Sequence, residues 1–186
     1  MSSRRDAAKV LRHLAKTLDV EETLAAFPGW TRESLGYLLR AMAARVQPPT
    51  TTAVLSVDGA ARGNPGEAGA GVVLQTPDGA VLRMGEYLGE ATNNTAEYKA
   101  LLAGMKKAAD LGIREMQVRS DSELMIKQLN GLYKVKSPHL QDLYFSVIKA
   151  ISAFDRVTFE HIPREENREA DRMANLAIDA KDTVTL

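Results

Sequence analysis

The sequence contains no cysteine and only three histidines. No apolar run approaches the roughly 20 residues that a membrane-spanning helix needs. The missing cysteine excludes disulfide bonds and thiolate-bound metals. The amino terminus is basic but lacks the apolar centre of a secretory signal. The acidic residues that soon follow argue against a mitochondrial presequence: Asp6, Asp19, Glu21 and Glu22. We therefore expect a cytoplasmic protein with no membrane contact.

The chain also lacks an excess of either charge, because 24 Lys and Arg balance 24 Asp and Glu. This balance argues against a protein that binds nucleic acid by bulk charge alone. The charges are nevertheless unevenly distributed. Residues 1–50 carry eight basic and five acidic side chains, a net of +3, and the remainder carries sixteen and nineteen, a net of −3. The basic first region hints at a contact with nucleic acid or protein.

Residues 1–46 have helical patterning and no convincing strand. Asp19 to Glu22 has the form of a helix-start capping box, in which the Glu22 carboxylate reaches back to the first amides. Pro28-Gly29 ends that helix, and Thr31 can cap another. Apolar residues recur at helical spacing on both sides of this break: Leu11, Leu14, Leu18 and Val20 before it, and Leu35, Leu38, Leu39 and Met42 after it. We expect the second helix to bury the last four of these side chains. We predict a small helical region over 1–46 and a linker over 47–52.

From residue 53 the pattern changes to strands followed by alternating helices and strands. Short apolar or alternating runs predict five strands, at 53–59, 69–74, 81–88, 116–119 and 157–162. Helical patterns lie at 95–111, 122–129, 139–154 and 167–179. This order is typical of the α/β class and predicts a five-stranded mixed sheet flanked by helices. The predicted domain covers 53–180, and 181–186 is expected to be a C-terminal tail.

Four acidic residues lie where predicted strands end or in predicted helices: Asp58, Glu97, Asp121 and Asp171. Each has an ordinary structural explanation. Asp58 could belong to a turn with Gly59. Glu97 could complete a capping box with Asn94. Asp121 could favour a helix dipole, and Asp171 could be an exposed helix residue.

Taken together, the four residues indicate a site. The ends of neighbouring central strands lie about 5 Å apart, so Asp58 and Asp121 would meet if their strands are adjacent. Four carboxylates in one pocket repel unless a cation neutralises them. Oxygen donors without Cys or a His cluster suit Mg²⁺, with Mn²⁺ as a substitute. Two such ions roughly 4 Å apart support phosphoryl transfer.

Four motifs resemble those of the type 1 ribonuclease H family, in the family's order and at compatible spacing. They are Val57-Asp58-Gly59-Ala60 with Gly63-Asn64-Pro65-Gly66, then Thr92-Asn93-Asn94-Thr95-Ala96-Glu97, then Ser120-Asp121-Ser122, and then Asn167-Arg168-Glu169-Ala170-Asp171. The resemblance covers residues 53–180 and implies a ribonuclease H-like fold. It also implies that Asp58, Glu97, Asp121 and Asp171 are catalytic residues and metal ligands.

The resemblance further implies that Gly59, Asn64, Asn93 and Asn94 contact the RNA strand of an RNA–DNA hybrid. Short amide side chains suit this role, because an A-like hybrid presents 2′-hydroxyls in a wide minor groove. The same residues also have structural interpretations, since Asn64 could form a tight turn and the other two asparagines could cap a helix.

The sequence departs from the family pattern in the connection at 131–138, which is short where many members carry a basic helix-loop handle. Binding of a hybrid would then depend on Lys134, Lys136 and His139, or on the amino-terminal region. A solvated loop is the alternative interpretation of the two lysines.

The family often carries a mobile His near its fourth motif, as a general acid or in product release. His161 stands at the matching distance before Asn167, but it ends a predicted strand, where packing is the alternative. Arg164 on the following turn could serve instead. Ser122 and Glu123 are further candidates for substrate binding.

The resemblance predicts an endonuclease that hydrolyses the RNA strand of RNA–DNA hybrids by a two-metal-ion mechanism. The products would carry 5′-phosphate and 3′-hydroxyl ends. The alternative is a non-catalytic nucleic-acid-binding or assembly module with the same fold. A nuclease of this fold that acts on DNA junctions is a third interpretation. We expect a monomer, and the role of residues 1–46 stays open.

Overall fold

A computed structural model describes residues 4–43 and 52–186. The chain divides into two compact units, Met1–Pro48 and Pro49–Leu186, which are described separately. Most of the predicted linker, residues 47–51, lies outside the described residues, and residue 52 already belongs to a strand. No helix in the described ranges is long and apolar enough to cross a membrane.

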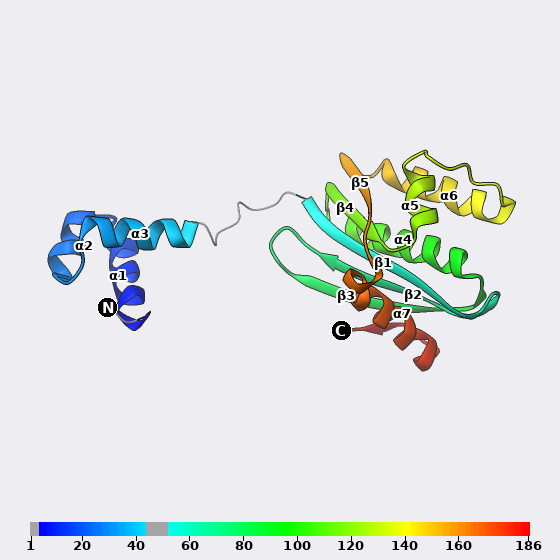
Figure 1. The fold of residues 1–186 in the computed structure, drawn as a ribbon, viewed down its shortest axis with the longest axis horizontal. Coiled ribbons are helices and arrows are strands. Elements are labelled where there is room, and N and C mark those ends of the chain that lie inside the picture. The colour runs from blue at the N-terminus through cyan, green and yellow to red at the C-terminus, as the bar shows by residue number, and fades with distance from the viewer. Residues whose placement is uncertain (1–3, 44–51) are drawn as a thin grey trace. The chain divides into compact units, whose positions relative to one another are not determined.

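The first unit consists of α1 Arg4–Thr17, α2 Val20–Ala26 and α3 Arg32–Ala43 (Figure 1). Val10 and Leu35 are its fully buried apolar side chains among the described residues. The ring of His13 packs edge-on against Phe27, with 5.6 Å between centroids. The predicted burial of Leu39 is wrong, because 39% of this residue is exposed. The side chain of Met42, which was also predicted to be buried, lies outside the described residues.

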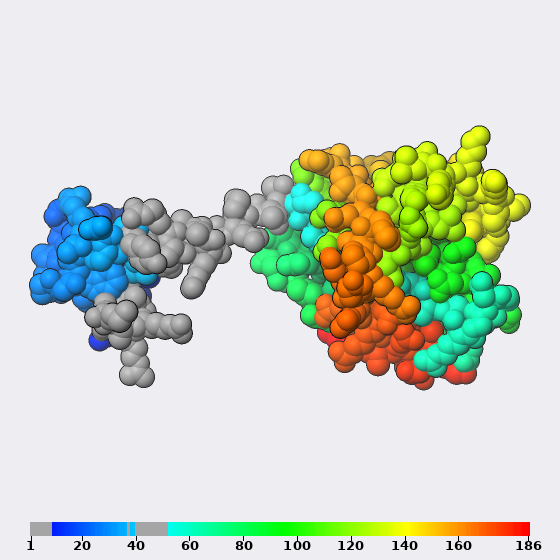
Figure 2. Space-filling model, viewed as in Figure 1, coloured from blue at the N-terminus to red at the C-terminus, as the bar shows by residue number. Residues whose placement is uncertain are grey.

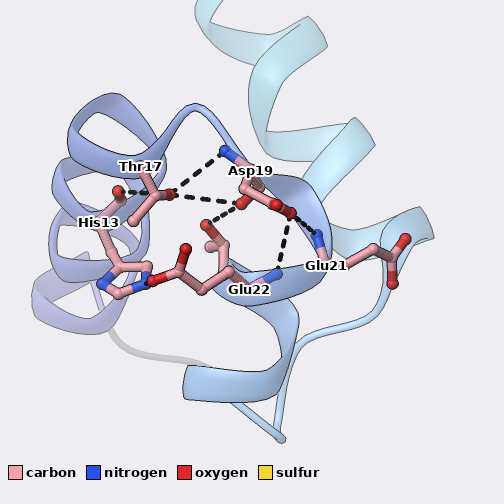
Figure 3. Close-up of polar contacts among 6 residues, drawn as sticks. His13, Thr17, Asp19, Glu21 and Glu22 are labelled. Carbon is pink, nitrogen blue, oxygen red and sulfur yellow. Dashed lines mark hydrogen bonds and ion pairs between the residues drawn. The ribbon is translucent and has the colours of Figure 1, made fainter.

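The helical register expected to run through Leu18 is also interrupted. Leu18 adopts a positive φ of 55° and is 85% exposed. This turn frees Asp19 to cap α2, where its Oδ1 accepts hydrogen bonds from the amides of Glu21 at 2.8 Å and Glu22 at 3.0 Å (Figure 3). The Glu22 carboxylate does not reach back as predicted. Its Oε1 instead lies 3.9 Å from His13 Nε2.

The second unit is a mixed sheet flanked by helices, as the sequence predicts. Its elements are β1 Thr52–Gly63, β2 Gly66–Gln75, β3 Val81–Ala91, α4 Asn93–Asp110, β4 Glu115–Ser120, α5 Glu123–Leu129, α6 Pro138–Ile151, β5 Arg156–His161, the 3₁₀ turn η1 Arg164–Glu166, α7 Arg168–Ala180 and β6 Val184–Thr185. The strand order is β5-β4-β1-β2-β3-β6. β1 is antiparallel to β2 and parallel to β4, and β4 is parallel to β5.

The predicted number of five strands is wrong, because the sheet has six. Part of the segment expected to be a C-terminal tail forms β6, which pairs antiparallel with Met84 and Gly85 of β3. The reason is that the outer edge of β3 has free backbone donors and acceptors. Two residues that follow α7 are enough to satisfy some of them.

The helices cover opposite faces of the sheet, with α4 on one face and α7 on the other (Figure 1). The alternation of side chains along β1 shows which residues face each helix. Leu55 lies against Gly104 of α4. Asp58 has the opposite parity and pairs with Gly71 of β2, which lies directly under the backbone of α7. Asp58 therefore belongs to the face that α7 covers.

The α7 helix lies unusually close to the sheet. A Cβ atom placed on Gly71 would lie 1.9 Å from the carbonyl oxygen of Ala170, and one on Gly85 would lie 2.3 Å from that of Met173. Only glycine leaves room for this approach. The apolar face of α7 then completes the core with five buried side chains: Ala170, Met173, Ala174, Ala177 and Ile178.

Candidate active site

Asp58 is a buried strand residue rather than part of a turn, since β1 continues to Gly63. Only 9% of its surface is exposed. The parallel register of β1 and β4 sets Ser56 beside Arg119. Continuing this register by two residues along each chain brings Asp58 beside Asp121, which follows β4 directly. β1 and β4 are therefore adjacent, as the predicted meeting of Asp58 and Asp121 required.

Glu97 lies one turn inside α4, not in a capping box. The N-cap of that helix is Thr92, whose hydroxyl accepts a hydrogen bond from the amide of Thr95. The two carboxylate oxygens of Glu97 have other partners. Oε1 accepts from Asn93 Nδ2 at 3.0 Å, and Oε2 accepts from the hydroxyl of Ser122. Glu97 is 9% exposed, so these bonds fix a buried carboxylate in place.

Asp171 lies in the first turn of α7, and its side chain is 36% exposed, so it is more open to solvent than Asp58 and Glu97. Its Oδ1 accepts a hydrogen bond from Arg164 Nη2 at 3.3 Å. The two residues line a cavity of about 290 Å³ together with Glu165 and Arg168. Figure 2 shows the orange segment that contains β5 and η1 continuing into the surface of α7.

The charges of these residues act on one another. Burial, together with the negative charges of Asp121, Asp171 and Glu97, raises the pKa of Asp58 to about 7, and the charge of Arg164 opposes this shift. Burial also raises the pKa of Glu97 to about 7, opposed by the hydrogen bond from Ser122. The four carboxylates proposed from the sequence thus lie close enough to form one electrostatic cluster centred on Asp58.

Asn167 is a residue that the sequence interpretation did not single out. Its side chain is 1% exposed, and its Nδ2 donates to Asp121 Oδ1 at 2.6 Å and to the carbonyl oxygen of Val57 at 2.9 Å. Its Oδ1 is buried without a hydrogen-bond partner in the described structure. The sequence offered one indication of this role, because Asn167 opens the fourth motif. At that position the sequence alone is equally consistent with a helix cap. No side-chain capping bond is present there.

Two of the predicted substrate-binding residues form a hydrogen-bonded series beside Glu97, and a third packs against its backbone. Asn64 Oδ1 accepts from the amide of Asn93 at 3.3 Å, and Asn93 in turn bonds to Glu97. Gly59 lies where β1 meets α4, and a Cβ atom there would be 2.1 Å from the amide nitrogen of Glu97. Gly59 is therefore required for packing, whatever it contributes to substrate binding.

The fourth predicted contact, Asn94, lines a cavity of about 570 Å³ that also includes Lys134 and Lys136. The two lysines are exposed. The short connection between α5 and α6 therefore places two ammonium groups in the same hollow as an asparagine from the start of α4. His139, which follows this connection, is also exposed and does not line the cavity.

Two further candidates, His161 and Glu123, have neighbours other than the four carboxylates. His161 ends β5 and pairs in register with Ser120, and its charge acts on Glu123 rather than on Asp58. Glu123 forms an ion pair with Lys127 at 2.6 Å. Of the two residues considered as a mobile acid, Arg164 contacts the carboxylate of Asp171, and His161 lies beside Ser120 at the end of β5.

The donor set suits a hard divalent cation, because it consists of carboxylate oxygens that repel one another in a desolvated position. Within residues 4–43 and 52–186, no three acidic or histidine side chains already lie at the mutual spacing of metal ligands. Metal binding at this cluster would therefore require side chains to rotate. Asp58, Glu97, Asp121 and Asp171 are the residues that would hold it.

Comparison with known proteins matches residues 56–177 to the family described as reverse transcriptase-like. Bifunctional protein Rv2228c of Mycobacterium tuberculosis is 44% identical over 129 residues, which are 68% of this chain and 35% of that protein. Ribonuclease HI of Halobacterium salinarum is 42% identical over 123 residues, which are 66% of this chain and 62% of that protein. The chain thus spans about a third to three fifths of the length of these relatives.

The solved structure of LC11-RNase H1 in complex with an RNA/DNA hybrid superimposes with a TM-score of 0.66 at 40% identity, covering 69% of this chain and 98% of that one. The family match lies within the second unit, as do the four carboxylates. By its sheet, its motifs and these similarities, the chain belongs to the type 1 ribonuclease H family.

Proposed function

We propose that this protein is a metal-dependent endonuclease that hydrolyses the RNA strand of RNA–DNA hybrids. The observation that carries the proposal is the electrostatic cluster of Asp58, Glu97, Asp121 and Asp171, drawn from β1, α4, the end of β4 and α7. The relative named ribonuclease HI and the hybrid-bound structure of LC11-RNase H1 support the choice of substrate.

The cluster would hold two Mg²⁺ ions, with Mn²⁺ as a substitute, which would supply Lewis acidity and neutralise phosphate charge. Asp58, the residue on which the other three charges act, would be one of the ligands of these ions. Asn93, Ser122 and Asn167 are proposed to orient Glu97 and Asp121 through the hydrogen bonds described above. Such outer contacts commonly fix the direction of metal-binding oxygens.

The reaction is the attack of a water molecule on a phosphorus atom of the RNA strand. The new phosphorus–oxygen bond replaces the bond to the 3′ oxygen, which leaves and takes up a proton. The products therefore carry 5′-phosphate and 3′-hydroxyl ends. Arg164 beside Asp171 is proposed to assist product release or the stabilisation of charge.

We propose that the hybrid is held by two groups of residues. Gly59, Asn64, Asn93 and Asn94 would contact the RNA strand through backbone and amide groups beside Glu97. Lys134 and Lys136, which share a cavity with Asn94, would contact phosphates. The cytoplasmic location and the monomeric state stay predictions from the sequence.

A labelled RNA–DNA hybrid incubated with the purified protein and Mg²⁺ tests this proposal. We expect cleavage within the RNA strand by the wild type and none by Asp58→Asn. Duplex DNA and duplex RNA of the same sequence serve as comparison substrates, and cleavage of branched DNA would favour the junction nuclease instead. Binding of the hybrid without turnover by the folded wild type would contradict the proposal and support the non-catalytic module.

A further inference from the structure

The segment between β5 and α7 is anchored at its two ends and exposed between them (Figure 1). At its start, Ile162 is buried and its amide donates to the carbonyl oxygen of Ser120 at 3.0 Å. At its end, the buried side chain of Asn167 donates to Asp121. Residues 163–166, which include η1, are exposed. Burial therefore fixes the two ends of the segment but not its middle.

Arg119 of β4 attaches the middle of this segment to the sheet. Its Nη2 donates to Glu166 Oε2 at 3.1 Å, and its Nε donates to Glu160 Oε2 at 3.2 Å. Glu160 is the neighbour of Arg119 across the strands, and it also accepts from Gln117 Nε2 at 3.0 Å. One guanidinium group thus joins β4, β5 and η1. Within the described part of the chain, Arg119 and Glu166 form the ion pair that links η1 to the sheet.

The Arg119–Glu166 pair differs from an ordinary surface ion pair. An exposed pair of flexible side chains contributes little, because both must lose conformational freedom to form it. The side chain of Arg119 is only 31% exposed, and Glu160 already holds one of its donors. A planar guanidinium that is oriented in this way loses little further freedom when it binds a second carboxylate. The pair can therefore restrict where η1 lies.

The position of η1 affects contacts to two of the four carboxylates. Arg164, at its start, donates to Asp171 at 3.3 Å. Asn167, directly after η1, donates to Asp121 at 2.6 Å. Glu166 lies in the chain between these two donors. A displacement of η1 from the sheet would therefore disturb both contacts.

We propose that Arg119 is a positioning residue, which acts through Glu166 to hold η1 and its neighbours against the candidate active site. The inference rests on the proposed function, because its effect on rate requires a nuclease. In this role Arg119 touches neither the substrate nor a metal ion. Its loss should lower kcat and leave KM for the hybrid unchanged, as expected when binding of the substrate is not affected.

The test compares the wild type with Arg119→Gln and Glu166→Gln, separately and together. Cleavage of a labelled RNA–DNA hybrid in Mg²⁺ gives kcat and KM for each protein. Each single variant should lower kcat about five- to tenfold, at or below the range typical for a direct partner of a metal ligand, and KM should change less than about twofold. The double variant should lose no more than either single variant, because the two side chains act through one contact.

Hydrogen exchange in EDTA measures how firmly η1 is held, independently of cleavage. The amides of Glu166 and Asn167 donate to the carbonyl oxygens of Pro163 and Arg164 at 2.9 and 3.0 Å. Both amides should exchange faster in Arg119→Gln than in the wild type, because a turn released from the sheet opens more often.

Arg114→Gln is the matched control, because it removes a similar guanidinium group from the other end of β4. Arg114 donates to both carboxylate oxygens of Asp155, at 3.1 and 2.6 Å, and to the carbonyl oxygen of Ala153 at 3.1 Å. These partners precede β5, at the end of that strand away from η1. This variant should keep the kcat and the amide exchange of the wild type.

Unchanged exchange of the two η1 amides in Arg119→Gln would overturn the inference. So would an unchanged kcat, a rise in KM alone, additive losses in the double variant, or an equal loss of kcat in Arg114→Gln. If the wild type itself does not cleave the hybrid, the proposed function fails. The exchange measurement then still decides whether Arg119 holds η1.

Discussion

The side-chain amide of Asn167 joins Asp121 to the backbone of the neighbouring strand. Nδ2 lies 2.6 Å from Asp121 Oδ1 and 2.9 Å from the carbonyl oxygen of Val57, the residue before Asp58. One buried amide group thus sets the position of the carboxylate after β4 relative to β1. Any geometry that needs Asp58 and Asp121 to act together depends on this contact.

We predict that Asn167→Ala lowers hybrid cleavage roughly 10- to 100-fold and raises the Mg²⁺ concentration needed for half-maximal rate, as is typical when an outer contact to a metal ligand is lost. The free energy of unfolding should fall by about 1–3 kcal/mol, because a buried hydrogen-bonding group is removed. Metal titrations of the cleavage rate, well below the melting temperature, measure the first effect. Asn130→Ala, at an exposed asparagine, is the control. An unchanged Mg²⁺ requirement would show that Asn167 has only a structural role.

Replacing Asp58 should separate activity from stability. Asp58→Asn removes a buried charge that burial and three neighbouring carboxylates disfavour. We expect activity to fall at least about 1,000-fold, since the residue is the centre of the cluster. In EDTA at pH 8 we expect the free energy of unfolding to rise by roughly 1–3 kcal/mol, because one pKa unit corresponds to about 1.4 kcal/mol. Urea unfolding measures the change in the free energy of unfolding. A variant less stable than the wild type would contradict the repulsion between Asp58 and its neighbouring carboxylates.

The stability of the metal-free protein should fall as pH rises. Asp58 has a pKa of about 7 in the folded protein and an ordinary value of 3.8, so the folded chain holds this proton longer than the unfolded chain. Its contribution to stability is fully present below pH 4 and is lost as pH rises towards about 7. Glu97 acts in the same direction.

Urea midpoints in EDTA at pH 5 and pH 8 measure this loss. Asp58→Asn should show a smaller decrease between the two pH values than the wild type, and Mg²⁺ should restore stability at pH 8 more than at pH 5. Parallel decreases in both proteins would rule out Asp58 as the source of the pH dependence.

Arg164 and His161 should differ in their effect on cleavage. Arg164 contacts Asp171 at 3.3 Å and is the cation that lowers the pKa of Asp58, whereas the charge of His161 acts on Glu123. We therefore expect Arg164→Ala to lower the cleavage rate about tenfold and His161→Ala to change it less than twofold. Single-turnover and steady-state rates of both variants distinguish an effect on chemistry from one on product release. A larger loss in His161→Ala would reverse this assignment.

Gly59→Ala should disrupt the contact between β1 and α4. The added Cβ would lie 2.1 Å from the amide nitrogen of Glu97, so strand or helix must shift. We expect a loss of at least about 2–3 kcal/mol in the free energy of unfolding. Gly29→Ala is the control, because a Cβ at Gly29 meets nothing within 4 Å. Thermal unfolding compares the two, and equal melting temperatures would contradict the close packing described here.

Much of the second unit is predictable from sequence because its signals are local. Alternating strands and the helical spacing of Leu101 and Met105 reflect which side chains are buried, and both are buried in the structure. Asp58 and Asp121 could be paired because parallel neighbouring strands end together. The motif order then provided a family whose fold the structure and comparisons confirm.

The features that sequence did not reveal depend on contacts between distant segments. β6 is two residues long and pairs through its backbone, so Val184 and Thr185 carry no strand signal of their own. The role of Asn167 depends on Asp121, 46 positions earlier in the chain. Leu18 leaves the helix because Asp19 caps the next one, and apolar periodicity does not register such a competition.

The glycines under α7 help to set the distance between Asp171 and Asp58. Gly71 and Gly85 let main-chain atoms of α7 rest directly on main-chain atoms of the sheet. The height of Asp171 above Asp58 is therefore fixed by the radii of backbone atoms, not by the rotamers of intervening side chains. A spacer made of backbone cannot be repacked or compressed by substitutions elsewhere in the core. The interval between the two carboxylates should thus persist while much of the surrounding sequence changes.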